Sequence, residues 1–126
     1  MQDGRWVAAV FWVAAAYDGI LGLIFIFAPA WAFGVMDVPP VNHYGYVRFP
    51  AGLLLVFAAM FVRIARDAGA NRTLIPYGIG LKLAYCLTVF GYWAGPGISA
   101  IWKPFALADL VFIVLFAMAY RGIGRH

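Results

Sequence analysis

Four long runs of hydrophobic residues occupy most of the chain, and short polar or turn-forming segments separate them. The runs extend over about residues 6–33, 44–64, 74–93 and 101–120. Each has the length of roughly 20 residues that a helix needs to cross the hydrocarbon core of a bilayer. Short alternating segments typical of strands are missing, and lipid tolerates only helices or closed barrels. The pattern predicts an all-α integral membrane protein: one domain over residues 1–126, forming an antiparallel bundle of four transmembrane helices.

The connections between these runs are short and contain residues that end or start helices. Gly34 and the prolines at 39–40 are predicted to end the first helix, and Asn42 is predicted to cap the second. Residues 66–72 and 95–97 are rich in the glycine, asparagine or proline that turns require. Connections this short place consecutive helices side by side and in opposite directions.

Composition supports a membrane protein and argues against a water-soluble globule. Hydrophobic residues make up 66% of the 126 residues and charged residues only 11%, whereas soluble domains average roughly 45–50% apolar residues. A cleaved signal peptide is an alternative for the first run, because Ala14 to Ala16 resemble a small-residue cleavage site. Hydrophobicity continues without a break to Phe33, which favours an intact helix.

The distribution of basic residues predicts the orientation. If the helices alternate in direction, most arginines fall on one side of the membrane, which the positive-inside rule assigns to the cytoplasm. Aromatic residues gather at the opposite interface as a belt. We therefore expect a bacterial inner membrane location with both termini cytoplasmic, and the net charge of +4 indicates contact with anionic lipid, with no nucleic-acid partner. The arginines are Arg5, Arg63, Arg66, Arg72, Arg121 and Arg125; the belt is Trp31, Tyr44, Tyr46, Trp93 and Trp102.

Each predicted helix contains a charged residue within its apolar run: Asp18, Arg48, Lys82 and Asp109. A charge at the centre of a bilayer costs on the order of 3 kcal/mol, so charges of opposite sign are expected to face one another. At 1.5 Å per residue, Lys82 and Asp109 lie at similar depths, and Arg48 can reach Asp18 or the outer headgroups. We expect two ion pairs or one four-membered network, serving either helix register or proton and solute binding.

The fourth run carries aromatic residues at helical spacing around its carboxylate. Trp102, Phe105, Phe112 and Phe116 share one face with Asp109. These rings either line a cavity for a flat hydrophobic or cationic ligand, or form the packing face of a tight bundle, which is the favoured interpretation. Tyr85, one turn from Lys82 on the third helix, is a further candidate for lining a ligand site.

Several chemistries find no support in the sequence. Cys86 is the single cysteine, only two histidines occur, and glutamate is absent. A disulfide within the chain is excluded, and neither a zinc site nor a bis-histidine haem can be assembled. Phosphate-binding loops and nucleophile elbows are also missing. We therefore predict no metal, no cofactor and no catalytic residues.

A set of residues distributed over the whole chain carries a resemblance to known proteins: Pro29 with Gly34, Asn42 with Arg48, Asn71 with Arg72, and Lys82 with Asp109. In this pattern the chain resembles small uncharacterised bacterial inner-membrane proteins with four helices, loosely like the DoxX-like families. Asp18 departs from the DoxX-like pattern, which has an arginine near the start of the first helix. The resemblance implies a four-helix membrane fold, and some members of such families act beside membrane oxidoreductases.

Three functions remain open from the sequence. The favoured one is a non-catalytic accessory or assembly subunit of a larger membrane complex, with a membrane-protein partner or a second copy packed on its apolar faces. The alternative is a carrier or binder of a small hydrophobic or cationic solute that uses the intramembrane carboxylates. A membrane enzyme acting on a lipid or quinone is the third, with Lys82, Tyr85 and Asp109 as the acid–base group.

Overall fold

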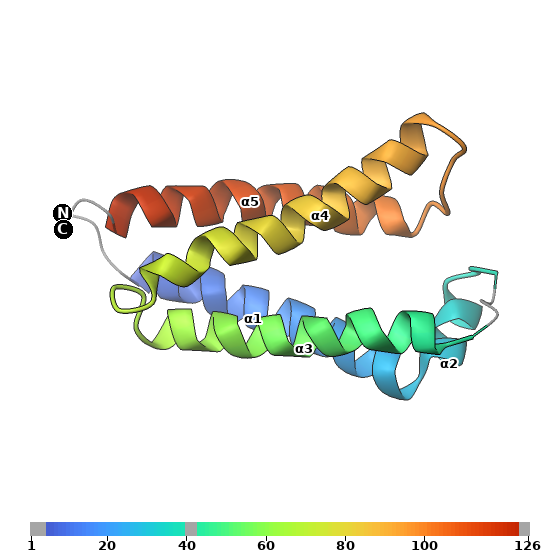
Figure 1. The fold of residues 1–126 in the computed structure, drawn as a ribbon, viewed down its shortest axis with the longest axis horizontal. Coiled ribbons are helices and arrows are strands. Elements are labelled where there is room, and N and C mark those ends of the chain that lie inside the picture. Colours follow the sequence, from blue (N-terminus) through green and yellow to red (C-terminus); the bar gives the residue numbers. More distant parts are fainter. Residues whose placement is uncertain (1–4, 40–42, 124–126) are drawn as a thin grey trace.

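The computed structural model describes residues 5–39 and 43–123, and the regular elements in these ranges are all helical. Four segments in this part of the chain are long and apolar enough to cross a membrane. The predicted all-α class with four candidate spans is confirmed. The elements in chain order are α1 (Arg5–Phe27), α2 (Pro29–Val35), α3 (Gly45–Arg66), the 3-10 turn η1 (Arg72–Leu74), α4 (Ile75–Ala94) and α5 (Trp102–Ile123) (Figure 1).

The four long helices form two closely packed pairs, α1 with α3 and α4 with α5. The pairs converge at the end of the molecule that contains η1, the start of α1 and the end of α5 (Figure 1). They diverge toward the opposite end, where α2 and the turn between α4 and α5 lie. The molecule therefore has a tightly packed end and an open end.

The first helix is shorter than predicted. A continuous helix was expected over residues 6–33, but α1 ends at Phe27 and α2 starts at Pro29. Ala28 between them has φ −141° and ψ 50°, outside the helical region. Proline has no N–H to continue the helix, and its ring forces the preceding residue out of the α conformation. The other three helices agree with their predicted ranges to within a few residues.

The predicted caps and connections differ in detail from the structure. Asn42, the expected cap of the second helix, lies outside the described residues. Tyr44 immediately precedes α3 and makes no capping hydrogen bond through its side chain. In the turn between α3 and η1, the Asn71 side-chain amide donates to the carbonyls of Arg63 and Asp67, at 3.1 and 2.9 Å. Both carbonyls also accept a backbone N–H, from Asp67 and Asn71 respectively, so this asparagine adds a second hydrogen bond to each and reinforces the turn after α3.

A core of aromatic rings fills the convergent end. Phe11, Phe61 and Phe116 are completely buried there. The rings of Phe11 and Phe116 stack with centroids 4.6 Å apart, and Phe61 lies 5.2 Å from Phe116. These three residues come from α1, α3 and α5, so their contacts hold the two helix pairs together at this end.

Close approach of α1 to α3 depends on a glycine. A Cβ atom on Gly22 would lie 2.9 Å from the carbonyl oxygen of Ala51 and 3.0 Å from the side chain of Leu55. Only a residue without a side chain fits against that backbone oxygen without a shift of one helix. This contact fixes the spacing of the pair next to Asp18, which is one turn away on α1.

Candidate functional site

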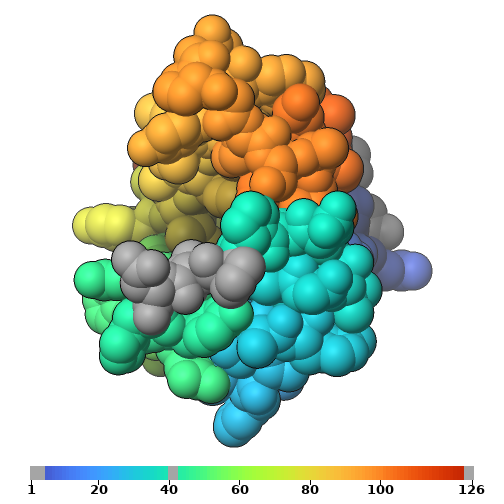
Figure 2. Space-filling model, turned by 90° about the vertical axis from the view of Figure 1, so that its right-hand side faces the viewer, coloured from blue at the N-terminus to red at the C-terminus, as the bar shows by residue number. Residues whose placement is uncertain are grey.

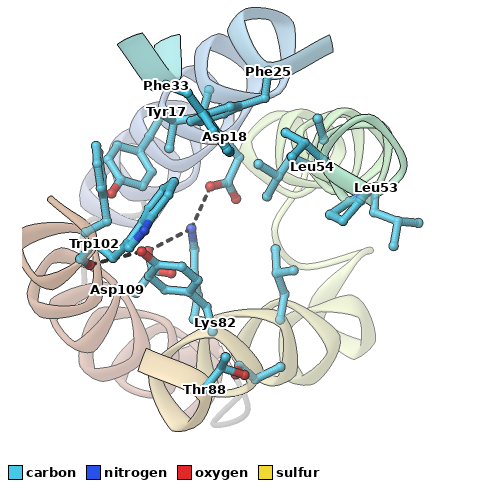
Figure 3. A pocket seen from close by; sticks show the side chains of 18 residues that line it. Tyr17, Asp18, Phe25, Phe33, Leu53, Leu54, Lys82, Thr88, Trp102 and Asp109 are labelled. Atoms are coloured by element: carbon cyan, nitrogen blue, oxygen red, sulfur yellow. Dashed lines mark hydrogen bonds and ion pairs between the residues drawn. The ribbon is translucent and has the colours of Figure 1, made fainter. Parts of the chain in front are cut away.

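The centre of the molecule contains a buried cluster of three charged side chains (Figure 3). The Lys82 ammonium donates a hydrogen bond to Asp18 Oδ1 at 2.7 Å and lies 3.1 Å from Asp109 Oδ1. The side chains of Lys82 and Asp18 are 1% and 2% exposed, and that of Asp109 is 8% exposed. Since the three residues belong to α4, α1 and α5, the cluster connects the two helix pairs.

Arg48 lies outside this cluster, so the predicted four-membered network, or second ion pair, does not form. Its side chain is exposed, and its Nε donates to the carbonyl of Ile26 at 3.0 Å. Ile26 is in the last turn of α1, where carbonyls lack partners within the helix. The break before Pro29 thus creates an acceptor for Arg48, and Lys82 takes the place of Arg48 as the partner of Asp18.

Aromatic rings surround the Lys82 ammonium. Its Nζ lies 4.9 Å from the ring centroid of Phe112, 5.0 Å from that of Tyr17 and 5.9 Å from that of Phe61. Ring faces attract cations, and the attraction is stronger where water is excluded. These rings therefore add cation–π attraction to the two contacts that the ammonium makes with carboxyl groups.

The two carboxyl groups are incompletely satisfied. Within the described residues, Asp18 Oδ2 and Asp109 Oδ1 are buried and accept no hydrogen bond. The contact of Asp109 Oδ1 with Lys82 is close enough for an ion pair but lacks hydrogen-bond geometry. Two carboxyl groups thus share one ammonium, and lone pairs on both remain available.

A cavity of about 590 Å³ lies beside the cluster, between the two helix pairs. Asp18, Lys82 and Asp109 line it and point toward one another (Figure 3). Its other lining residues include Phe33 of α2 and Trp102 at the start of α5, so the cavity extends from the cluster toward the open end of the molecule. Most of its remaining wall is apolar. The aromatic wall residues are Tyr17, Phe25, Phe33, Tyr85, Trp102 and Phe105.

The side of the cavity between α1 and α5 is closed by tilted and edge-on rings. Trp102 at the start of α5 lies 6.1 Å from Phe25 and 6.4 Å from Phe33, measured between ring centroids. Tyr17 and Phe105 lie 6.2 Å apart further along the same seam. Figure 2 looks onto the open end and shows the orange turn between α4 and α5 meeting the cyan region around α2.

The side between α3 and α4 is more open. Leu53 of α3 and both Ala84 and Thr88 of α4 line the cavity and are also exposed on the surface of the molecule. All three lie within segments that are apolar enough to span a membrane. The cavity therefore has a lateral opening between α3 and α4.

The four aromatic residues predicted to share one face of the last helix fall into two groups in the structure. Trp102 and Phe105 line the cavity, whereas Phe112 and Phe116 are buried in the core. Tyr85 also lines the cavity, and its hydroxyl donates to the carbonyl of Trp102 at 3.0 Å. One helix face thus lines the cavity at its start and packs in the core further along, and the ligand-lining role stays a prediction.

Several cavity residues were not identified from the sequence. Tyr17 precedes Asp18 directly, and its buried hydroxyl has no hydrogen-bond partner among the described residues. Hydrophobicity predicts Phe33 at the end of a continuous first helix, but the break at Ala28 turns it back toward Trp102. Proline 29 is the signal that could have located this turn.

No group of three or more metal-binding side chains occurs in residues 5–39 and 43–123. Cys86 is buried as a free thiol, and its Sγ donates to the carbonyl of Ala106 at 3.4 Å. It thereby links α4 to α5.

Comparisons with models of known protein families, with curated proteins and with solved structures found no match for this chain. The resemblance to DoxX-like proteins remains a prediction.

Proposed function

We propose that the protein spans a bacterial inner membrane as an antiparallel four-helix bundle with both termini on the cytoplasmic side. Arginines at the convergent end support this orientation: Arg63 and Arg66 in the last turn of α3, Arg72 in η1 and Arg121 in the last turn of α5. Lys103, by contrast, lies in the first turn of α5, at the open end. An excess of basic residues on one side is typical of the cytoplasmic face.

We propose further that the protein binds a small, largely apolar molecule in the cavity above the Asp18–Lys82–Asp109 cluster. The observation that carries this proposal is the combination of a cavity of about 590 Å³ with buried charged groups at one end. Small-molecule sites typically have volumes of about 300–1,000 Å³, mostly apolar walls and a few convergent polar groups. The cavity has each of these properties.

A purely structural role explains less of the arrangement. An ion pair that only fixed helix register would be expected in a packed interface, where neighbouring side chains exclude empty volume. Here the packed core around Phe11, Phe61 and Phe116 adjoins the charged groups on one side only, and the cavity adjoins them on the other. Ionisable residues that line an intramembrane cavity are typical of solute and ion pathways.

The accessory-subunit and enzyme hypotheses remain predictions. Exposed apolar side chains occur on all four long helices, and lipid covers such surfaces as readily as a protein partner does. For catalysis, the Lys82 ammonium already contacts two carboxylates, and the Tyr85 hydroxyl is bonded to a backbone carbonyl. No observation favours either role over ligand binding.

The test is to fill the cavity and to compare the small molecules that copurify with the protein. Ala84 lines the cavity and is exposed at its lateral opening, so Ala84→Phe places a ring in the cavity without disturbing the core. Ala59→Phe is the matched control, because Ala59 is exposed on α3 and does not line the cavity. Both variants and the wild type are extracted gently from their own membrane, and the bound molecules are identified by solvent extraction and mass spectrometry.

We expect one molecule to be enriched in the wild type and in Ala59→Phe, and to be depleted in Ala84→Phe. Equal amounts of every extracted molecule in the three samples would show that the cavity retains no ligand, and the proposal would fail.

A further inference from the structure

We infer that the ligand is a lipophilic cation, an ammonium group attached to an apolar body, and that the second carboxyl of the cluster is its counter-charge. This inference rests on the proposed ligand site and names the chemical class of molecule that the site takes. It depends on three features: the charge count of the cluster, its unused acceptors and the aromatic wall next to it.

The charge count of the cluster is unbalanced. Asp18 and Asp109 carry two carboxyl groups, and Lys82 is the one basic residue that lines the cavity. Arg48 is bonded to a backbone carbonyl at the open end of α1 and is exposed. An unpaired charge in a medium of low dielectric is costly, so a bound cation at this site is favourable.

The acceptors that such a cation needs are already in place. Asp18 Oδ2 and Asp109 Oδ1 are buried and accept no hydrogen bond from the described residues. Lys82 donates its hydrogen bond to the other oxygen of Asp18. A carboxylate is an acceptor-only group, and N–H donors of an ammonium are suitable partners for its free lone pairs.

Aromatic rings adjoin the cluster on the cavity side. Tyr85, Trp102 and Phe105 line the cavity beyond Asp109, and their rings offer the kind of surface that attracts cations. The protein already uses this interaction for Lys82, whose ammonium lies 4.9 Å from the ring centroid of Phe112. Aliphatic residues such as Leu21, Leu54 and Leu81 form much of the remaining wall and suit an apolar body.

The experiment compares two probes of nearly equal size that differ in charge: 1-naphthylmethylamine, which is a cation at neutral pH, and 1-naphthylmethanol, which is neutral. Their affinities are measured by equilibrium dialysis against the full-length protein in phosphatidylcholine nanodiscs, with empty nanodiscs as the blank. Zwitterionic lipid is used so that the bilayer itself does not attract the amine.

We expect the amine to bind the wild type at least about tenfold more tightly than the alcohol. Asp109→Asn and Asp18→Asn should each remove most of this preference, because each should weaken binding of the amine more than binding of the alcohol. Asp37→Asn is the matched control: Asp37 is exposed in a loop with φ of 57°, a conformation that asparagine tolerates. It should retain the preference.

Equal affinity for the two probes in the wild type would overturn the inference, because the comparison needs no variant to fold. If Ala84→Phe weakened both probes equally in that case, the proposed ligand site would stand without its cation preference. Binding of neither probe above the blank would overturn the inference and count against the site itself. A preference for the amine that survived in both carboxyl variants would also overturn it.

A further set of measurements distinguishes two sources of a lipophilic ammonium group: the headgroup of a lipid and a free amine. Nanodiscs in which phosphatidylethanolamine replaces part of the phosphatidylcholine present an ammonium headgroup within the bilayer. Weaker binding of the amine in these nanodiscs would assign the site to a lipid headgroup, and unchanged binding would assign it to a free amine; both results require the cation preference to be present.

Discussion

Replacing Lys82 by methionine should be the most damaging single change in the polar interior. Methionine keeps an unbranched side chain of similar length but removes the ammonium that lies 2.7 Å from Asp18 and 3.1 Å from Asp109. Both carboxyl groups are then left without a counter-charge inside the protein. Removing one partner of a buried ion pair costs about 3–5 kcal/mol, whereas a volume-conserving change in packing costs less than about 1.5 kcal/mol.

Single changes at the carboxylates should cost less, because each leaves Lys82 with one remaining partner. Asp18→Asn loses the charge of the shorter contact, which is a hydrogen bond to a charged group worth about 1.5–3 kcal/mol. The triple variant Lys82→Met, Asp18→Asn, Asp109→Asn has no unpaired charge and should regain much of the stability lost in Lys82→Met alone.

Stability can be measured by reversible unfolding in mixed micelles with increasing dodecyl sulfate, followed by circular dichroism. The expected order of stability is wild type, then Asp18→Asn, then Lys82→Met. A free energy of unfolding for Lys82→Met within about 0.5 kcal/mol of the wild type would refute the reasoning, since it would mean that the two carboxyl groups do not depend on the ammonium.

Three further predictions use the same unfolding assay. Gly22→Ala should lower the free energy of unfolding by about 1–3 kcal/mol, because its Cβ would meet an α3 carbonyl oxygen. Gly52→Ala is the control: no atom lies within 4 Å of its Cβ, so it should be neutral or slightly stabilising. Equal effects of the two changes would contradict the close α1–α3 contact. Phe116→Ala should cost about 3–5 kcal/mol and Phe105→Ala clearly less, since only the first ring is fully buried. A larger loss of stability in Phe105→Ala than in Phe116→Ala would contradict a packed core at the convergent end. Arg48→Gln should change the free energy of unfolding by less than about 1 kcal/mol, because the arginine is exposed and outside the cluster. A loss comparable to that of Lys82→Met would mean that Arg48 belongs to the charged cluster after all.

Much of the secondary structure could be predicted from the sequence, because an apolar run of about 20 residues has few alternatives to a helix. The contact between Lys82 and Asp109 was also predictable, since their helices are consecutive and their depths are similar. The break at Ala28 was missed because hydrophobicity continues through Pro29, and the local effect of a proline was given too little weight. That omission also misplaced Arg48, whose acceptor is a carbonyl at the end of α1.

The cavity could not be predicted because it arises from how the helices diverge, which helical periodicity does not specify. Periodicity places Trp102, Phe105, Phe112 and Phe116 on one face of α5 and treats them as equivalent. They become different because the helix pairs converge around Phe116 and separate around Trp102. The same divergence leaves the carboxyl groups with free acceptors facing a cavity.

The central claim is that the cavity beside Asp18, Lys82 and Asp109 is a ligand site. Native mass spectrometry of the intact protein, released gently from its own membrane, tests it most directly. We predict a species heavier than the bare chain by one small molecule, present at one copy per chain in the wild type and in Ala59→Phe and strongly reduced in Ala84→Phe. A wild-type spectrum that contains only the bare chain, or an added mass that Ala84→Phe retains in full, would contradict the account.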